Sequence, residues 1–248
     1  MQNFKLNEEF LLNNQDWTFP TFTAYGPGRF KEIGKFCKNF KINNALIVTD
    51  SGSVNLPFIS DLQNLLNDSK IKSDIYSNIS PNPRDDEIDS GCKKFREGNH
   101  DAIIAIGGGS AMDGGKAISL TVDSGVPLWD FEFEKEPPKL TMENPFPKII
   151  TIPTTAGTGA ETEVTAMVTH LEKGMKFCLW HPDARPCLAL VDPELTLKLP
   201  ANLTAWTGID AMIHAIEGYS VPMFHPLCDG SALELSLIHI SEPTRLWT

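Results

Sequence analysis

The sequence lacks long hydrophobic runs. Ala102–Ile106 is typical of its longest, whereas a helix that spans a bilayer needs about 20 apolar residues. Cations are also scarce, because 21 Lys and Arg face 32 Asp and Glu in 248 residues, a formal net charge of −11. This mean field repels nucleic acids and anionic membrane surfaces, so we expect neither as a partner. Main-chain amides can still bind an anionic cofactor, because they supply the positive field locally.

Cysteine is sparse and unpatterned. The five cysteines are odd in number, widely spaced and without a CxxC pair, which argues against a disulfide framework and against a zinc cluster. The first ten residues, MQNFKLNEEF, have neither a secretory nor a transit pattern. We therefore expect a cytoplasmic protein with reduced thiols.

Short apolar runs alternate with longer amphipathic ones over the first two hundred residues. A run of four to six apolar or β-branched residues suits a strand that is buried on both faces of a parallel sheet. We expect such strands at Ala45–Thr49, Ala102–Ile106, Ile149–Ile152 and Leu188–Val191. Apolar residues at helical spacing predict helices at Leu56–Asn67, Asp85–Glu97 and Ala111–Val122. This order predicts an α/β fold with an open, mostly parallel sheet.

The composition and periodicity of the sequence change at two places. Trp129–Pro147 holds four prolines and four glutamates in nineteen residues, which predicts a surface loop. After Pro200 the pattern becomes helical from near Thr204 to Gly218 or beyond. We place a domain boundary near Asp192–Leu199, so that an α/β domain covers residues 1–195 and the start of an all-helical domain covers residues 196–234.

The end of the chain departs from both patterns. A helical run at Pro226–Glu234 gives way to alternation in LSLIHISEPTRLWT. The string LSLIHISEPTR resembles an in-frame reading of a transposase adapter used for sequencing libraries. We expect Leu235–Thr248 to be a non-native tail and give His239 no role; a natural short strand followed by a tail is the alternative.

The string DAIIAIGGGSAMDGGK contains a glycine turn, which we define as Gly107–Ser110. A buried strand runs into three glycines, and a helix is expected to open at Ser110 or Ala111. Glycines let a pyrophosphate approach main-chain amides, and a helix start adds positive potential. Ser110 could cap the helix or donate to a phosphate. The alternative is a plain strand–turn–helix, since neither GxGxxG nor a Walker A loop is present.

Two further features could complete a dinucleotide site. The string IPTTAGTGAE follows another buried strand and offers small residues and hydroxyls, although Thr154, Thr155 and Thr158 fit turn and capping roles equally well. Asp50 ends a strand, where a carboxylate can hold a ribose diol and repel a 2′-phosphate. It precedes the glycines instead of following them, so a shared site needs an unusual chain order, and a turn role is the alternative.

Asp210 and His214 stand four residues apart in a predicted helix. This spacing stacks a carboxylate and an imidazole on one face, where they could hold one cation. The surrounding apolar residues predict that this face is buried. A hydrogen-bonded pair without metal is the alternative, because a catalytic ion takes three or four protein ligands. For His100, His170, His181 and His225 we expect surface or turn roles.

These segments together resemble the iron-containing (group III) alcohol dehydrogenase family. The strings that carry the resemblance run in the family's order, from about residue 20 to residue 234. They are Ile47–Asp50, Pro81–Pro83, Gly107–Lys116, Pro153–Thr158 and Leu199–Tyr219.

The resemblance implies an N-terminal NAD-binding α/β domain and a helical metal-binding domain, with the active site between them. It implies that the residues of the glycine turn hold the pyrophosphate and that Asp50 holds the ribose. The other implied cofactor-binding residues are Asn82, Asp113, Thr154, Thr155, Thr158 and Lys176. Asp210 and His214 would be two of four metal ligands; the other two, histidines further downstream in the family, do not occur before Glu234. We therefore expect an inactive, C-terminally truncated fragment.

The implied reaction is hydride transfer between NAD and a primary or secondary alcohol or a diol. A divalent ion, Fe²⁺ by family with Zn²⁺ as an alternative, would lower the pKa of the alcohol oxygen. No side chain is identified as a proton carrier. The implied partner is a small alcohol or aldehyde, and homodimers are common in the family.

Two other functions compete with this interpretation. A lyase of the dehydroquinate synthase type would need cations for a phosphorylated substrate, but Leu195–Tyr219 offers only Lys198. A non-catalytic nucleotide-binding protein is the third hypothesis.

Overall fold

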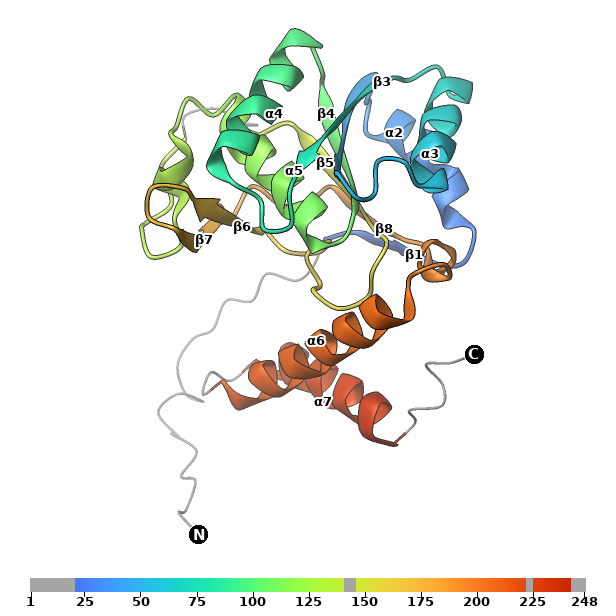
Figure 1. The fold of residues 1–248 in the computed structure, drawn as a ribbon, viewed down its shortest axis with the longest axis vertical. Coiled ribbons are helices and arrows are strands. Elements are labelled where there is room, and N and C mark those ends of the chain that lie inside the picture. The colour runs from blue at the N-terminus through green and yellow to red at the C-terminus, as the bar shows by residue number, and fades with distance from the viewer. Residues whose placement is uncertain (1–20, 141–145, 222–224, 242–248) are drawn as a thin grey trace. The chain divides into compact units, whose positions relative to one another are not determined.

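The computed structural model describes residues 21–140, 146–221 and 225–241 (Figure 1). They form two compact units. The larger unit takes in residues 21–155 and Gly159–Leu199, and the smaller unit takes in Ala156–Thr158 and the helices that follow Leu199. No helix in the described ranges is long and apolar enough to cross a bilayer.

A six-stranded parallel sheet forms the centre of the larger unit. The strands in spatial order are β1 (Thr23–Tyr25), β8 (Leu188–Val191), β5 (Lys148–Pro153), β4 (Ala102–Gly107), β2 (Asn44–Asp50) and β3 (Lys72–Ile79). Neighbouring strands of the centre are in close register, with Ala45 opposite Ala102 and Ala102 opposite Lys148. The four predicted strands are all present, and the prediction of an open parallel α/β sheet is confirmed.

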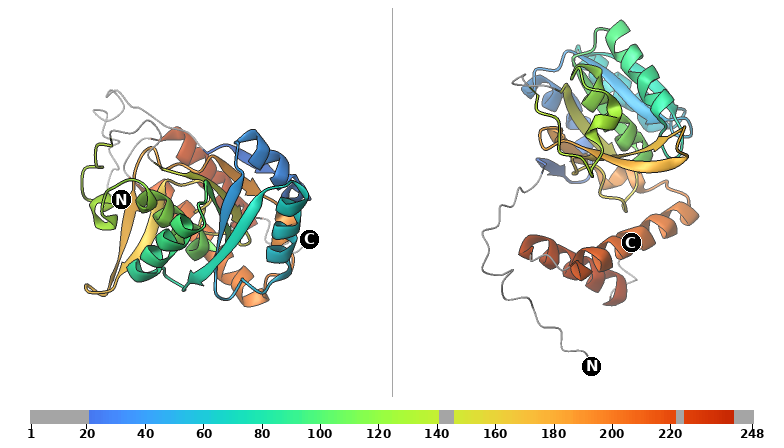
Figure 2. Two further views of the ribbon diagram at one scale, coloured as in Figure 1. Left: turned by 90° about the horizontal axis from the view of Figure 1, so that it is seen from above. Right: turned by 90° about the vertical axis from the view of Figure 1, so that its left-hand side faces the viewer.

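Helices cover both faces of this sheet, as Figure 2 shows from two further sides. Alternate residues of the strands enter two separate cores. Leu46 and Ile103 pack in one core with α4 (Asp85–Glu97) and α5 (Gly109–Val122). Ile47 and Ile104 pack in the other core with α2 (Ile33–Asn39) and α3 (Pro57–Asp68). Because both faces are covered, all six residues of β4 are buried, which explains its wholly apolar sequence.

An antiparallel hairpin of β6 (Thr165–His170) and β7 (Met175–Trp180) adds a second, two-stranded sheet, and β6 lies beside α5. Among the described residues, three short 3₁₀ helices occupy connections: η1 (Arg29–Glu32), η2 (Leu128–Phe131) and η3 (Pro193–Thr196). The prediction of a surface loop from Trp129 is wrong at its start, because Phe131 of η2 is fully buried in the core shared with α5.

The smaller unit contains α6 (Ala201–Ser220) and α7 (Pro226–Ser241), which pack together. The predicted helix after Pro200 is confirmed and begins three residues earlier than expected. The expected end of the next helix at Glu234 is wrong, since α7 continues through Leu235–Ser241. The remaining residues of the predicted non-native tail lie outside the described residues.

Candidate functional site

The order of winding reverses beside β2. The chain goes from β2 to β3 on one side, then returns to place β4 on the other side of β2 and continues outward to β5. In open α/β sheets ligands bind at such a reversal, outside the carboxyl ends of the strands. β2 ends at Asp50 and β4 ends at Gly107. The topology therefore brings these two predicted residues to the same end of adjacent strands.

Gly107 occupies a position that only glycine fits. Its φ is +144°, and a β-carbon there would come 2.8 Å from Ala111 Cβ and 3.1 Å from Asp50 Oδ2. The chain can therefore leave β4 and enter α5 with the Asp50 carboxylate directly beside the turn. This contact explains how the acid and the glycines share a site although the acid comes first in the sequence.

The helix after the glycine turn begins at Gly109, earlier than the predicted Ser110 or Ala111. Gly108 is the N-cap residue, with extended backbone and no side-chain cap. The first turn of a helix has N–H groups without intrahelical partners and carries a partial positive charge. The helix start after the glycines is therefore present, and its amides have the chemistry that an anion site needs. Ser110 is the second residue of the helix, so its alternative role as a cap is excluded.

Asn82 and Ser110 meet at this end of the sheet. Asn82 follows β3 and has a φ of +63°, a conformation that asparagine adopts more readily than most residues. Its main-chain N–H donates to Ser110 Oγ at 3.4 Å. The loop after β3 is therefore joined to the glycine turn.

The threonine-rich segment meets the glycine turn from the other side. The buried Thr154 donates its N–H to the carbonyl oxygen of Gly107 at 2.9 Å. The side chain of Thr155 lies 3.8 Å from the place where Gly108 would carry a β-carbon. We call the resulting set the cradle: Asp50, Asn82, Gly107, Gly108, Gly109, Ser110, Thr154 and Thr155.

Asp50 also fills the turn role that the sequence left open. Its Oδ1 accepts the N–H groups of Gly52 and Ser53, both at 2.9 Å. Since Oδ2 faces Gly107, one oxygen holds the turn and the other lies beside the glycine turn. The carboxylate is thereby fixed in orientation.

Three other predicted residues lie elsewhere. Lys176 is exposed on β7, opposite Thr169, and Thr158 belongs to the smaller unit. Asp113 lies in the first turns of α5, where its Oδ1 is 3.3 Å from Nζ of Lys116. Burial raises the pKa of Asp113, and the Lys116 ammonium acts in the opposite direction. Asp113 is thus paired inside the protein.

Lys116 is a residue that the sequence analysis missed. Its side chain is 1% exposed, and Nζ donates to the carbonyl oxygen of Ala160 at 2.8 Å. The sequence did contain a signal for this buried pair. Asp113 and Lys116 stand three residues apart on a predicted helix, and their immediate neighbours are glycine and apolar residues.

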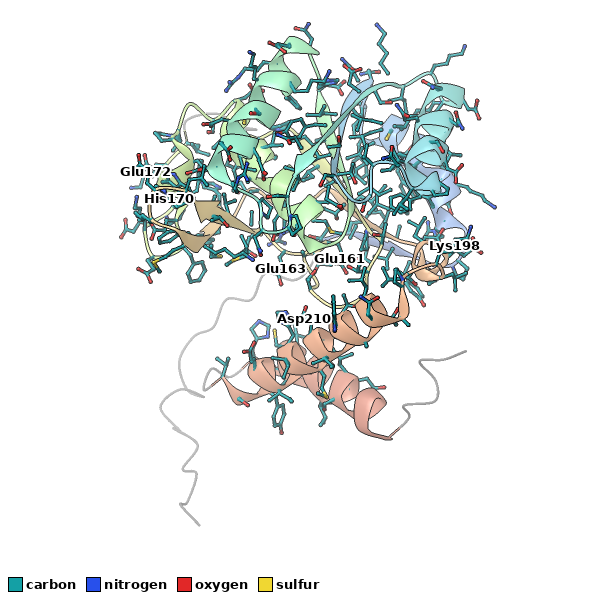
Figure 3. All side chains as sticks on the ribbon, viewed as in Figure 1. Glu161, Glu163, His170, Glu172, Lys198 and Asp210 are labelled. Carbon is teal, nitrogen blue, oxygen red and sulfur yellow. The ribbon has the colours of Figure 1, made fainter. Side chains whose placement is uncertain are left out.

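Asp210 and His214 form the predicted pair on α6, where Figure 3 labels Asp210. His214 Nε2 lies 3.7 Å from Asp210 Oδ1. The prediction that this face is buried is wrong, because the side chains are 43% and 52% exposed. Apolar neighbours did not produce burial, since Ile209, Ile213 and Ile216 of the same helix are exposed too.

The pair has the chemistry of a partial metal site. Carboxylate oxygen and imidazole nitrogen are both ligands of Fe²⁺ and Zn²⁺. Donor atoms 3.7 Å apart are close enough for one ion to bind both. Within the described residues, no three His, Cys, Asp or Glu side chains gather as a metal site. The two donors therefore fit a cation but do not complete its coordination.

Two of the histidines for which surface or turn roles were expected are buried, and of these His181 does fill a turn role. His100 is buried, with Nδ1 3.0 Å from Asn44 Oδ1. His181 is buried as well, and its Nδ1 accepts the N–H of Asp183 within a turn. Neither residue approaches the cradle through these contacts.

The parallel sheet, its reversal beside β2 and the glycine turn define the larger unit as an open α/β fold of the class that binds ligands at the carboxyl ends of its strands. The sequence model of the family described as "Iron-containing alcohol dehydrogenase" matches residues 20–193. The chain belongs to the iron-containing alcohol dehydrogenase family.

Known proteins that are similar to this chain in sequence or structure include enzymes that are named for different alcohols. The chain is 34% identical to a choline dehydrogenase of Bacillus subtilis, over 86% of this chain and 53% of that protein. It is also 34% identical to an NAD-dependent methanol dehydrogenase of Bacillus methanolicus, over 87% of this chain and 55% of that protein. A crystal structure of 1,3-propanediol oxidoreductase superposes with a TM-score of 0.82 at 31% identity, over 90% of this chain and 57% of that one. The chain spans about half the length of the curated relatives it matches.

Proposed function

We propose that the larger unit is an NAD-binding domain and that the cradle is its binding site. The observation that carries the proposal is the position of Asp50 Oδ2 beside Gly107 at the reversal of the sheet. A pyrophosphate fits the glycine turn, where small residues and the start of α5 leave main-chain amides accessible. The Asp50 carboxylate suits a ribose diol and disfavours a 2′-phosphate, so NAD is preferred over NADP.

Asn82, Thr154 and Thr155 complete this binding site in the proposal. They supply an amide and hydroxyl groups around the glycine turn. Asp113, Thr158 and Lys176 are proposed cofactor residues on the strength of the family pattern alone. The methanol dehydrogenase relative, which is named as NAD-dependent, supports the choice of nicotinamide cofactor.

We further propose that α6 belongs to a metal-binding domain and that Asp210 and His214 hold a divalent cation, Fe²⁺ by family or Zn²⁺. When bound, such a cation supplies Lewis-acid activation of an alcohol oxygen. Asp210 and His214 contribute one oxygen and one nitrogen to it, and their helical spacing fixes the two donors relative to each other.

The activity we propose is NAD-dependent dehydrogenation of a primary or secondary alcohol or a diol, with a small aldehyde or ketone as product. The relatives are named for alcohols as different as choline and methanol, and we leave the substrate at this class. Because Asp210 and His214 alone do not complete a metal site, we expect the 248-residue chain by itself to oxidise little or no alcohol.

Isothermal titration of the chain with NAD and with NADP tests the cofactor proposal. We expect one NAD site per chain and weaker binding of NADP. Absence of NAD binding at millimolar concentration, or tighter binding of NADP, would contradict it. Titration with Zn²⁺ in the presence of NAD separately tests the metal proposal, for which weak binding is expected.

A further inference from the structure

Lys116 is a buried cation whose charge does not reach solvent. Lysine side chains usually extend along an apolar surface until the ammonium meets water. The Lys116 ammonium instead lies inside the larger unit, between Asp113 Oδ1 at 3.3 Å and the carbonyl oxygen of Ala160 at 2.8 Å. Burying an ammonium is unfavourable unless it is paired and hydrogen-bonded, so these two contacts determine where the side chain can sit.

The carbonyl that receives Lys116 belongs to the segment that joins β5 to β6. Three successive carbonyls of this segment each accept a hydrogen bond from a different part of the unit. Lys116 of α5 donates to Ala160, Thr151 Oγ1 of β5 donates to Glu161 at 2.7 Å, and Thr21 Oγ1 donates to Thr162 at 2.7 Å. The end of the segment nearest β6 is therefore held at three consecutive peptide units.

The same segment begins in the cradle. Thr154 is bonded to Gly107 by its N–H, and Thr155 packs beside Gly108. Both ends of the segment are thus bonded to the strand and helix around the glycine turn. One end is bonded to Gly107 at the end of β4, and the other is bonded to Lys116 of α5. Figure 3 labels Glu161 and Glu163 on it, just beyond Ala160. Only four residues, 156–159, connect Thr155 to Ala160, so fixing the Ala160 carbonyl limits the conformations that are open to Thr155.

We infer that Lys116 is a positioning residue for the cofactor site: its ammonium, oriented by Asp113, fixes the carbonyl of Ala160 and thereby holds Thr154 and Thr155 against the glycine turn. The inference rests on the proposed NAD site, of which these threonines form one side. Lys116 touches no cofactor atom in this account. Its effect is to organise the threonine side of the cradle before the cofactor binds, which lowers the ordering cost of binding.

The test compares NAD with AMP, which carries only the adenosine half of the cofactor. Lys116→Met keeps the length and apolar stem of the side chain and removes the ammonium. We expect the Kd for NAD to rise about tenfold, because a disordered threonine segment must be ordered on binding. The Kd for AMP should change less than about twofold, because Asp50, Gly108 and Gly109 make no contact with Lys116 that the variant removes. If the variant were only partly folded, the Kd for NAD and the Kd for AMP would both rise.

A second variant and a matched control complete the design. Thr151→Val removes the hydroxyl that donates to the carbonyls of Glu161 and Leu188, with almost no change in shape. It should also raise the ratio of the Kd for NAD to the Kd for AMP. If Lys116→Met does not fold, this variant tests the inference by itself. Ser119→Ala, on the same helix, removes a buried hydroxyl that donates to the Pro147 carbonyl at 3.0 Å. That control should leave the ratio unchanged.

Two outcomes would overturn the inference. If Lys116→Met and Thr151→Val both fold and keep the wild-type ratio of the Kd for NAD to the Kd for AMP, the role of Lys116 is refuted. The proposed NAD site is not affected by that result. A wild-type chain that binds no NAD would overturn the proposed function, and the inference with it.

Discussion

Asp50 lies beside Gly107, although two helices and a strand separate them in the chain: a β-carbon on Gly107 would lie 3.1 Å from Asp50 Oδ2. In the usual dinucleotide fold the acid follows the glycines. In this protein it precedes them, and the reversal of winding beside β2 restores their proximity. The order of residues along the chain is thus less informative about a site than the order of strands in the sheet.

Asp50→Asn tests the ribose role of the carboxylate. Asparagine retains an oxygen for the N–H groups of Gly52 and Ser53, so the turn should persist. Loss of the charge should raise the Kd for NAD by about tenfold, since hydrogen bonds to charged groups contribute about 1.5–3 kcal/mol, and should narrow the preference over NADP. Titration with both cofactors measures this. Asp61→Asn, an exposed acid on α3, is the control, and an unchanged NAD-to-NADP ratio in Asp50→Asn would refute the role.

Gly107→Ala and Gly108→Ala separate the fold from the binding site. Alanine at 107 would adopt a φ of +144° and press on Ala111, so we expect a loss of about 1–3 kcal/mol in the free energy of unfolding. Alanine at 108 has its nearest neighbours at 3.8 Å, so stability should change by less than about 0.5 kcal/mol while NAD binding weakens. Urea unfolding and titration check both. Equal stability of the two variants would contradict the strain argued for Gly107.

Asp192 is predicted to be a strong stabilising residue outside the cradle. It is 2% exposed and accepts the N–H groups of Gly28, Phe30 and Glu194 at 3.1, 2.8 and 3.0 Å. Asp192→Ala leaves these three donors unpaired and should cost about 2–4 kcal/mol in urea unfolding. Glu194→Gln, next to the same turn but exposed, should cost less than about 0.5 kcal/mol. Similar losses in the two variants would show that the carboxylate is not the anchor.

Glu161 should make stability depend on pH. Burial raises the pKa of its carboxyl group above the usual value. A carboxyl group with a raised folded-state pKa favours the folded state below its unfolded-state pKa, and this contribution is lost as the pH rises through the folded-state pKa. Glu161→Gln should therefore gain stability relative to wild type as the pH rises above the usual carboxyl pKa of about 4.3. Glu172→Gln, exposed on the β6–β7 hairpin, should show no such trend. A flat difference for Glu161→Gln would exclude the effect.

His214→Ala tests the metal pair. The wild-type chain should bind Zn²⁺ weakly at one site, because a carboxylate and an imidazole are only part of a coordination sphere. His214→Ala should weaken this binding at least about tenfold, since one of two donors is lost. Glu217→Gln on the same helix should leave it unchanged. Calorimetric titration distinguishes these results, and unaltered Zn²⁺ binding by His214→Ala would remove α6 from the metal site.

The central strands were predictable from the sequence because burial on both faces demands uninterrupted apolar runs, as in Ala102–Ile106. α4 matches its predicted range, Asp85–Glu97, because its first turn is acidic and its stripe of Ile88, Cys92 and Phe95 has helical period. β3 was missed because it is an edge strand with Lys72, Asp74 and Asn78 among its residues. β1 is only three residues long, and α2 and the β6–β7 hairpin were also missed.

The cradle, too, was predictable from the sequence only in part. Its glycines and the start of α5 were visible, because a strand, three glycines and a helical pattern follow one another directly. The bond between Asn82 and Ser110 depends on a positive φ and on the strand order, which residue types alone do not specify. For α6 the apolar composition predicted burial of His214, yet burial requires a second surface, and a sequence pattern does not supply its partner.

The location of NAD binding is the central claim, and chemical-shift mapping of the isotope-labelled chain tests it most directly. On titration with NAD, the amide signals of Gly108, Gly109, Ser110, Gly52 and Ser53 should shift together, at the carboxyl ends of β2 and β4. Shifts gathered instead around Lys41, Asn99 and Asp101, at the opposite ends of these strands, would contradict the account.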